Sequence, residues 1–183
     1  MKKKTAALIV AAAIIVAAAV GGTWAWLTSA SLTLDNTFTS GNVEITLQET
    51  TGDRYIMTPG VTLQKDPVVT VKAGSVKNWL FVQLERTSDF DMYMTYEMAD
   101  GWTLLAGHPG VYYRVAEKGK ADVSYPVLKW NAIVVKADLT EEQLAAITTL
   151  PRLTVFAAAI QYDGMETASI AWNTILSERG SNA

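Results

Sequence analysis

The chain has 183 residues, no Cys, 50% hydrophobic residues and a formal net charge of -3. These totals fit one globular domain and exclude a disulfide-stapled scaffold and an intrinsically disordered chain. Residues 1–25 hold three Lys and no acid, so the remainder has 12 basic and 18 acidic residues and a formal charge of -6. Because such a domain repels phosphate and anionic lipid, we expect no nucleic-acid partner.

Residues 1–25 have the three-part layout of a secretory signal peptide: a basic start, an apolar block and then small residues. Thr23 and Ala25 supply small side chains at the -3 and -1 positions. We therefore expect cleavage between Ala25 and Trp26, with cleavage after Ala30 as the alternative. The apolar run is shorter than the roughly 20 residues that span a bilayer, so we expect membrane contact only through the uncleaved signal peptide.

Alternation of apolar and polar residues with a period of two is the main signal in the mature chain. Residues 31–38 and 42–49 both alternate in this way, and the "TSG" between them indicates a turn or a bulge. The apolar face of the first segment carries Leu32, Leu34 and Phe38. Both segments are therefore predicted to be strands with one buried face.

Further short strands, separated by Gly- and Pro-containing turns, are predicted along the middle of the chain. They lie at residues 69–71, 80–84, 102–105, 111–116, within 127–135 and at 153–160. Pro67 should begin its strand or lie on a sheet edge, because it has no N–H to donate. The number and spacing of these strands favour an all-β sandwich.

Two segments change to a helical period. Thr140 and Gln143 have the spacing of a capping box, and Pro151 ends the segment that follows. Near the C-terminus, Met165, Ala168 and Trp172 recur at helical spacing, which predicts a short helix that covers one end of the sheets. The sequence thus predicts an all-β, jelly-roll-like antiparallel β-sandwich with one or two short helices, preceded by an N-terminal signal helix.

Residues suited to catalysis are few. The only His is His108, between two Gly residues, and thiolate ligands are absent because there is no Cys. Asp89 and Asp91 lack the further ligands of a calcium loop, and the scattered Trp residues fit core positions better than a sugar platform. We therefore expect no catalytic residue, no metal site and no cofactor.

Three blocks of the sequence resemble the TasA/camelysin family of secreted Gram-positive proteins. The first follows the leader and contains "NTFTSG" at residues 36–41. The second, "MTPGVTLQKDPVVTVKAGSVKNWLFVQLE", matches the family through Pro59, Gly60, Lys65, Asp66, Gly74 and Ser75. The third is "VFAAAIQYDGMETASIAWN", near the C-terminus.

The resemblance implies a jelly-roll sandwich, export through a dedicated signal peptidase and assembly of copies of the chain into extracellular fibres of a biofilm matrix. Residues 26–40 would be a donor strand for a neighbouring copy, and residues 41–183 the sandwich domain. The polymer interface would then contain Trp26, Leu27, Leu32, Leu34 and Phe38. Such a donated strand would satisfy an open sheet edge.

Three alternatives stay open. Residues 31–38 can pair within their own domain as an ordinary first strand. The protein can be a monomeric exported binding module for a peptide or a glycan. Camelysins have also been classed as metalloproteases, and with one His and no Cys this chain would need an all-carboxylate metal site.

Overall fold

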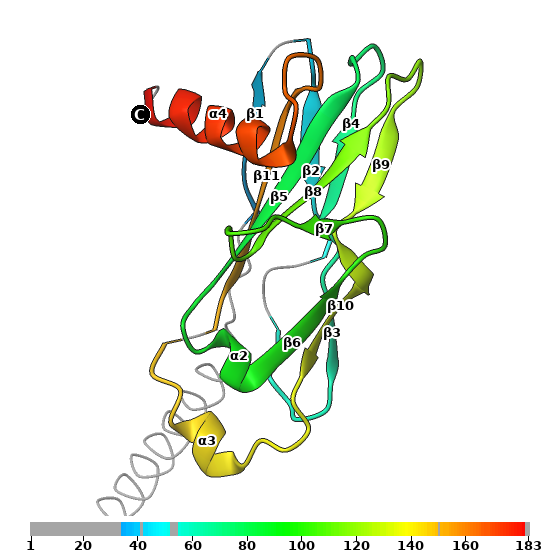
Figure 1. Ribbon diagram of the computed structural model, residues 1–183. Helices are drawn as coiled ribbons and strands as arrows, with labels where there is room; N and C mark the ends of the chain where they lie inside the picture. Colours follow the sequence, from blue (N-terminus) through cyan, green and yellow to red (C-terminus); the bar gives the residue numbers. More distant parts are fainter. Residues whose placement is uncertain (1–33, 41, 52–54, 150, 182–183) are drawn as a thin grey trace, which may run out of the picture.

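The computed structural model describes residues 34–40, 42–51, 55–149 and 151–181, which form two layers of β-strands (Figure 1). The first layer is a five-stranded sheet in the order β1 (Leu34–Ser40), β11 (Leu153–Gln161), β5 (Asn78–Arg86), β8 (Val111–Ala116) and β7 (Thr103–Leu104). The second layer consists of two three-stranded sheets. One has the order β2 (Ile45–Gln48), β4 (Val68–Val71) and β9 (Val123–Pro126), and the other β3 (Thr62–Gln64), β10 (Leu128–Val135) and β6 (Met94–Met98).

The second layer is interrupted where β3 passes into β4 and where β9 passes into β10. Residues 65–67 separate the first two strands, and Val127 separates the others. Pro67 has no N–H for a ladder, but its carbonyl oxygen accepts a hydrogen bond from the Val127 N–H at 2.9 Å. The Lys65 N–H donates to the Asn131 carbonyl oxygen at 2.7 Å, so the interruption is bridged by backbone hydrogen bonds.

The main core lies between the two layers. Its centre contains Leu80 and Val82 from β5, Val155 and Ala159 from β11, and Val69, Ile133 and Val135 from the opposite layer. Complete burial of aliphatic side chains of this size stabilises the fold by about 1.5–3 kcal/mol each. Since no disulfide is present, this core supplies most of the stability.

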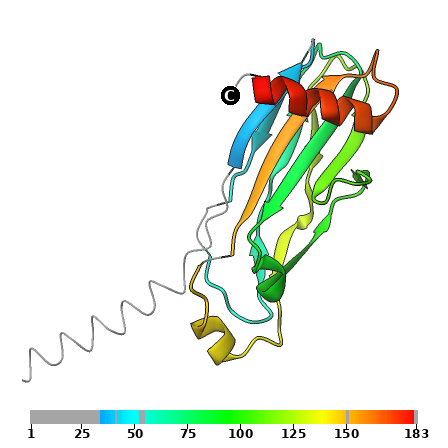
Figure 2. The same ribbon diagram turned by 60° about the vertical axis from the view of Figure 1, so that its left-hand side comes forward.

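A second core lies on the outer face of the five-stranded sheet, under α4 (Ala168–Ser181) (Figure 2). The Trp172 ring lies 5.2 Å from the Phe81 ring. The alternating pattern of residues 80–84 placed Phe81 on the polar side of its strand, but this side chain is completely buried. α4 crosses one face of the sheet, and strand β5 is therefore buried on both faces.

The all-β sandwich fold class is confirmed, with two corrections. Strand β1 runs parallel to β11, whereas the sequence analysis expected only antiparallel pairing. The described residues contain three helices, since α2 (Phe90–Tyr93) accompanies α3 (Glu141–Ala145) and α4. The predicted capping box at the start of α3 is confirmed: Gln143 N–H donates to Thr140 Oγ1, and Thr140 N–H donates to Gln143 Oε1.

Several strand predictions are confirmed closely, including β8, β11 and β4. Strands β3, β6 and β9 were not predicted. None of the helices among the described residues is long and apolar enough to cross a membrane. The predicted signal peptide of residues 1–25 and its helix lie outside the described residues.

Candidate functional site

Strand β1 forms one edge of the five-stranded sheet, and β11 is its only partner within the described part of the chain. Leu34 lies opposite Val155, and after a register shift Thr37 and the residues up to Ser40 lie opposite residues 157–160. This is a parallel ladder, whereas the other described strand pairs are antiparallel. β1 is thus held by a single ladder.

β11, the neighbour of β1 in the sheet, is long and apolar and has small side chains at its centre. β11 has nine residues, and Ala157, Ala158 and Ala159 at its centre are all buried. If β1 were removed, one row of N–H and C=O groups on β11 would lose its partners. An exposed apolar edge of this length invites pairing with another chain.

Helix α4 covers the same edge from the outer face, where it contacts β1, β11 and β5 (Figure 2). The Arg179 guanidinium lies 5.1 Å from the centre of the Phe156 ring on β11. β1 therefore lies beside β11 at the sheet edge and is also contacted by α4.

Immediately after β1, the backbone is hydrogen-bonded to the turn between β4 and β5. The Asn42 carbonyl oxygen accepts a hydrogen bond from Val76 N–H at 3.1 Å, and the Glu44 carbonyl oxygen accepts one from Lys72 N–H at 2.9 Å. Ser75 Oγ accepts a further hydrogen bond from Glu44 N–H at 3.1 Å. The backbone from Asn42 onward is thus fixed to the β4–β5 turn, independently of β1.

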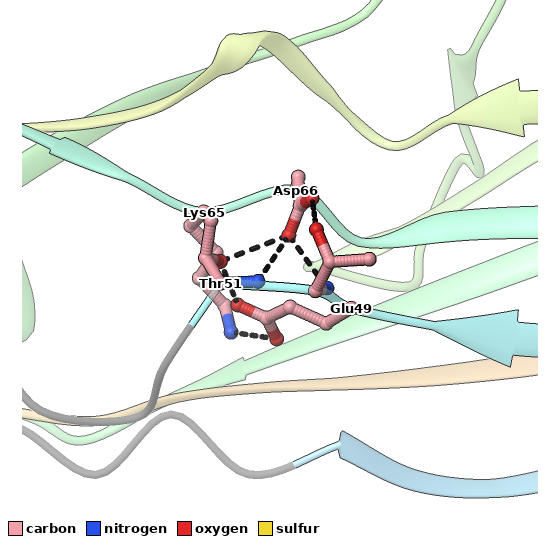
Figure 3. A network of polar contacts seen from close by, with 5 residues as sticks. Glu49, Thr51, Lys65 and Asp66 are labelled. Atoms are coloured by element: carbon pink, nitrogen blue, oxygen red, sulfur yellow. Dashed lines mark hydrogen bonds and ion pairs between the residues drawn. The ribbon is translucent and has the colours of Figure 1, made fainter.

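A buried ion pair fixes the far end of β2, which precedes Glu49 in the chain. Lys65 Nζ donates to Glu49 Oε2 at 2.6 Å, and the two side chains are only 0% and 3% exposed (Figure 3). Burial lowers the pKa of Lys65, against the opposing effect of the Glu49 carboxylate. The pair lies where the second layer is interrupted, so it joins β2 to the β3–β4 connection.

Asp66 reinforces this junction as a hydrogen-bond acceptor (Figure 3). It accepts from Thr50 N–H at 3.0 Å, from Thr51 N–H and Oγ1 at 2.9 Å each, and from Thr50 Oγ1. Burial acts to raise the pKa of Asp66, but these hydrogen bonds outweigh it and lower the pKa to about 2. We call Glu49, Thr50, Thr51, Lys65 and Asp66 the β2 anchor.

The other residues on which the second resemblance rests, Pro59, Gly60, Gly74 and Ser75, lie in the connections between strands. Val61 N–H donates to the Thr58 carbonyl oxygen at 3.1 Å around Pro59 and Gly60, and Gly60 has φ +77°. Pro followed by Gly with a positive φ is the pattern of a type II turn. Sequence comparison thus singled out residues that the structure places in turns and in the β2 anchor.

The predicted polymer-interface residues fall into two groups. Leu34 and Phe38 belong to β1, and the backbone of Phe38 lies in register with Ala158. Trp26, Leu27 and Leu32, with the expected cleavage site Ala25–Trp26, lie outside the described residues.

Sequence reasoning missed the ion pair of the β2 anchor. Lys65 stands among polar neighbours and has the appearance of a surface residue, and nothing local indicates that its ammonium group is buried against Glu49. The one usable signal was that Lys65 and Asp66 both belong to the second block that carries the resemblance.

The residues first weighed as metal ligands have other partners. Asp91 forms an ion pair with Arg86, whose Nη1 lies 2.6 and 2.8 Å from the two carboxylate oxygens. His108 lies in the turn before β8, where its N–H donates to the Leu105 carbonyl oxygen and its carbonyl oxygen accepts from Val111 N–H. Each therefore has a structural role.

Comparison with known proteins gives one match. The family described as camelysin metallo-endopeptidase matches residues 1–77. The resemblance to the TasA/camelysin family is thus confirmed over this part of the chain, which contains the first block and most of the second but not the third. Neither the curated proteins nor the solved structures include a match.

The family description raises the question of a metal centre. Within the described ranges, no group of three or more His, Asp or Glu residues lies close enough together to hold a metal ion. A catalytic zinc ion usually takes three protein ligands. The described residues therefore do not fit such a centre.

Proposed function

We propose that this chain, whose first 77 residues match the camelysin family, is a secreted structural subunit that assembles head-to-tail into extracellular fibres. Removal of residues 1–25 frees a new N-terminus at Trp26, and β1 of one copy is then donated to β11 of the next. The observation that carries the proposal is the parallel edge strand β1, which has one strand partner among the described residues and begins at Leu34, close to the expected cleavage site.

Exchange of β1 between copies conserves its interactions. The ladder to β11 that β1 forms within one copy is the ladder that it forms with the next copy, so little net hydrogen bonding is lost. The contact is head-to-tail and need not close on itself, because each copy donates at one place and accepts at another. Repetition of this contact produces a filament.

The hydrogen bonds that follow β1 in the chain hold the rest of the domain, so β1 can leave without moving β2. Ser40 ends the strand, whereas Asn42 and Glu44 are hydrogen-bonded to the β4–β5 turn. Gly41 stands between these two parts in the sequence and is the residue type that best tolerates a change of backbone direction. The β2 anchor holds the rest of the subunit in place during the exchange.

The decisive experiment pins β1 to its own copy. Thr37 and Ala157 lie opposite each other in the ladder, and the chain has no Cys, so Thr37→Cys with Ala157→Cys, oxidised as a dilute monomer, gives one disulfide within the same copy. The oxidised mature protein should remain monomeric at concentrations where the reduced protein forms fibres in negative-stain images. The single variant Thr37→Cys is the control, and fibres from the fully oxidised double variant would refute the proposal.

A binding module is the second candidate, and one observation favours it. Trp130 is 72% exposed, and both it and Asn131 have positive φ, at 55° and 53°. A backbone held in this region costs about 1–3 kcal/mol per residue and often marks a functional position. If this function holds, Trp130→Ala should abolish retention of the monomeric protein on a glycan array.

A further inference from the structure

Arg114, on β8, is an arginine whose charge has no ionic partner among the described residues. Its guanidinium carbon lies 4.1 Å from the centre of the Tyr125 ring and 5.4 Å from that of Trp102. Its Nε is buried and lacks a hydrogen-bond partner. Burial lowers the pKa of Arg114, because its charge is partly removed from water.

Other cations of the domain are paired differently. Ion pairs of 2.6–3.0 Å join carboxylates to Lys65, Lys72, Lys77, Arg86 and Lys129. Arg114 instead has two aromatic rings for neighbours. Such stacking leaves the N–H groups at the edge of the guanidinium plane free to bind a carboxylate in a bidentate manner.

The surroundings of Arg114 are fixed by the backbone. Gly101 has φ +87°, and a Cβ at this position would lie only 3.0 Å from Arg114 Nη2. Trp102 Nε1 donates to the Pro126 carbonyl oxygen at 2.9 Å, which sets the position of the indole. The β6–β7 turn, β8 and β9 together therefore form a defined site around the guanidinium.

This site lies between two incomplete sheet edges. β7 pairs with β8 only at Tyr112 and Tyr113, so β8 extends beyond it from Arg114 onward. In the other layer, β9 pairs with β4 alone among the described strands (Figure 1). An extended segment can add to such an edge while one of its side chains reaches the arginine.

We propose that Arg114, Trp102 and Tyr125 form a carboxylate-binding site, and that its occupant is an acidic side chain on an extended segment of a second copy of this chain. The composition supports this occupant, because the chain after residue 25 carries 18 acidic and 12 basic residues, so a second copy offers carboxylates in excess of its own cations. A carboxylate restores to the guanidinium the hydrogen bonds that burial withholds. The contact lies at the opposite edge from β1 and is independent of strand exchange.

The test uses the oxidised Thr37→Cys, Ala157→Cys protein, in which strand exchange is blocked. Its result therefore does not depend on whether β1 is exchanged between copies. Its self-association is measured by sedimentation velocity at low and high salt. Arg114→Gln should weaken association by about tenfold or more, the effect expected of one charge-assisted contact, and Arg114→Lys should weaken it less. Lys118→Gln, which removes an exposed cation after the same strand, should leave association unchanged.

Two further measurements complete the test. Near-UV circular dichroism checks that each Arg114 variant keeps its fold. Titration with acetate and with a short Glu-containing peptide, followed through the Arg114 Nε NMR signal, separates carboxylate binding from self-association. The proposal is overturned if the oxidised double-Cys protein associates equally well with Arg114 and with Arg114→Gln. It is also overturned if the oxidised double-Cys protein remains monomeric and its Arg114 signal responds only to added peptide.

Discussion

The two edges of the five-stranded sheet are closed in different ways. At one edge, β1 supplies a parallel ladder, with one register shift, to β11, and α4 contacts both strands. At the other, β7 has only two residues and leaves the end of β8 open beside Arg114. The first edge is covered by a strand with a parallel ladder, whereas the second carries a charge and a very short strand, which are common protections against unwanted pairing.

This difference separates two kinds of contact between copies. A contact at the β1 edge, as proposed above, would exchange the β1–β11 ladder and would depend on backbone hydrogen bonds. A contact at the Arg114 edge would depend on one charged side chain and would therefore weaken with salt. Variants that change one edge and not the other can test whether the two are independent.

Deletion of residues 26–40 should have the largest effect, because it removes β1 and leaves β11 open. We expect complete loss of fibres, with a fold that is retained but less stable. A synthetic peptide of residues 26–40 should bind the open edge of β11 and raise the Tm of the truncated protein as the peptide concentration increases. If the truncated protein is unfolded and the peptide does not restore it, β1 is an ordinary first strand.

Loss of the buried carboxylate in the β2 anchor should have the next largest effect. Glu49→Ala leaves Lys65 buried without its partner and should lower the free energy of unfolding by about 3–5 kcal/mol, measured by urea denaturation. The double variant Glu49→Leu, Lys65→Met should recover much of this loss. Glu97→Gln, which breaks the exposed pair with Lys129, should cost only about 0–1 kcal/mol.

Asp66 gives a smaller effect that depends on pH. Its pKa of about 2 in the folded protein lies below the ordinary value of 3.8, so its stabilisation is present above about pH 4 and is lost as the pH falls toward 2. The full effect should be about 2 kcal/mol. Asp66→Asn should flatten this part of the stability–pH curve, and an unchanged curve would show that the hydrogen bonds from Thr50 and Thr51 do not act on its charge.

Thr140→Ala should have the smallest effect and serves as a test remote from both edges. It removes the N-cap hydrogen bond of α3 and should cost about 1 kcal/mol in thermal or urea unfolding. Fibre formation and association through Arg114 should be unchanged. Thr148→Ala is the control, and loss of fibres in Thr140→Ala would mean that any loss of stability prevents assembly.

The sequence predicted the elements whose local pattern agrees with their burial. β8 and β11 were found because their apolar residues and turns are both clear, and α3 because Thr140 and Gln143 have capping-box spacing. β9 was missed because it is short, exposed and ends at Pro126. β5 was found with its buried face, but the burial of its second face was missed, since α4, which covers Phe81, is distant in sequence.

For the candidate sites too, the sequence predicted local features and missed contacts between distant segments. A special N-terminal strand was anticipated from its alternation and its position after the leader. Its parallel pairing with β11 could not be read from the sequence, because the two strands are far apart along the chain and share no turn. The Arg114 site was also missed, since it combines residues from a turn and two strands that meet only in the folded protein.

The position of the β2 anchor has a mechanical consequence. In a filament built by exchange of β1, a pulling force passes from one subunit to the next through the short connection at residue 41. The force then reaches Asn42, Glu44 and β2, whose far end is held by the buried Glu49–Lys65 pair. The load is thereby carried into both sheets of the second layer, and its weakest point should be the exchanged strand rather than the subunit itself.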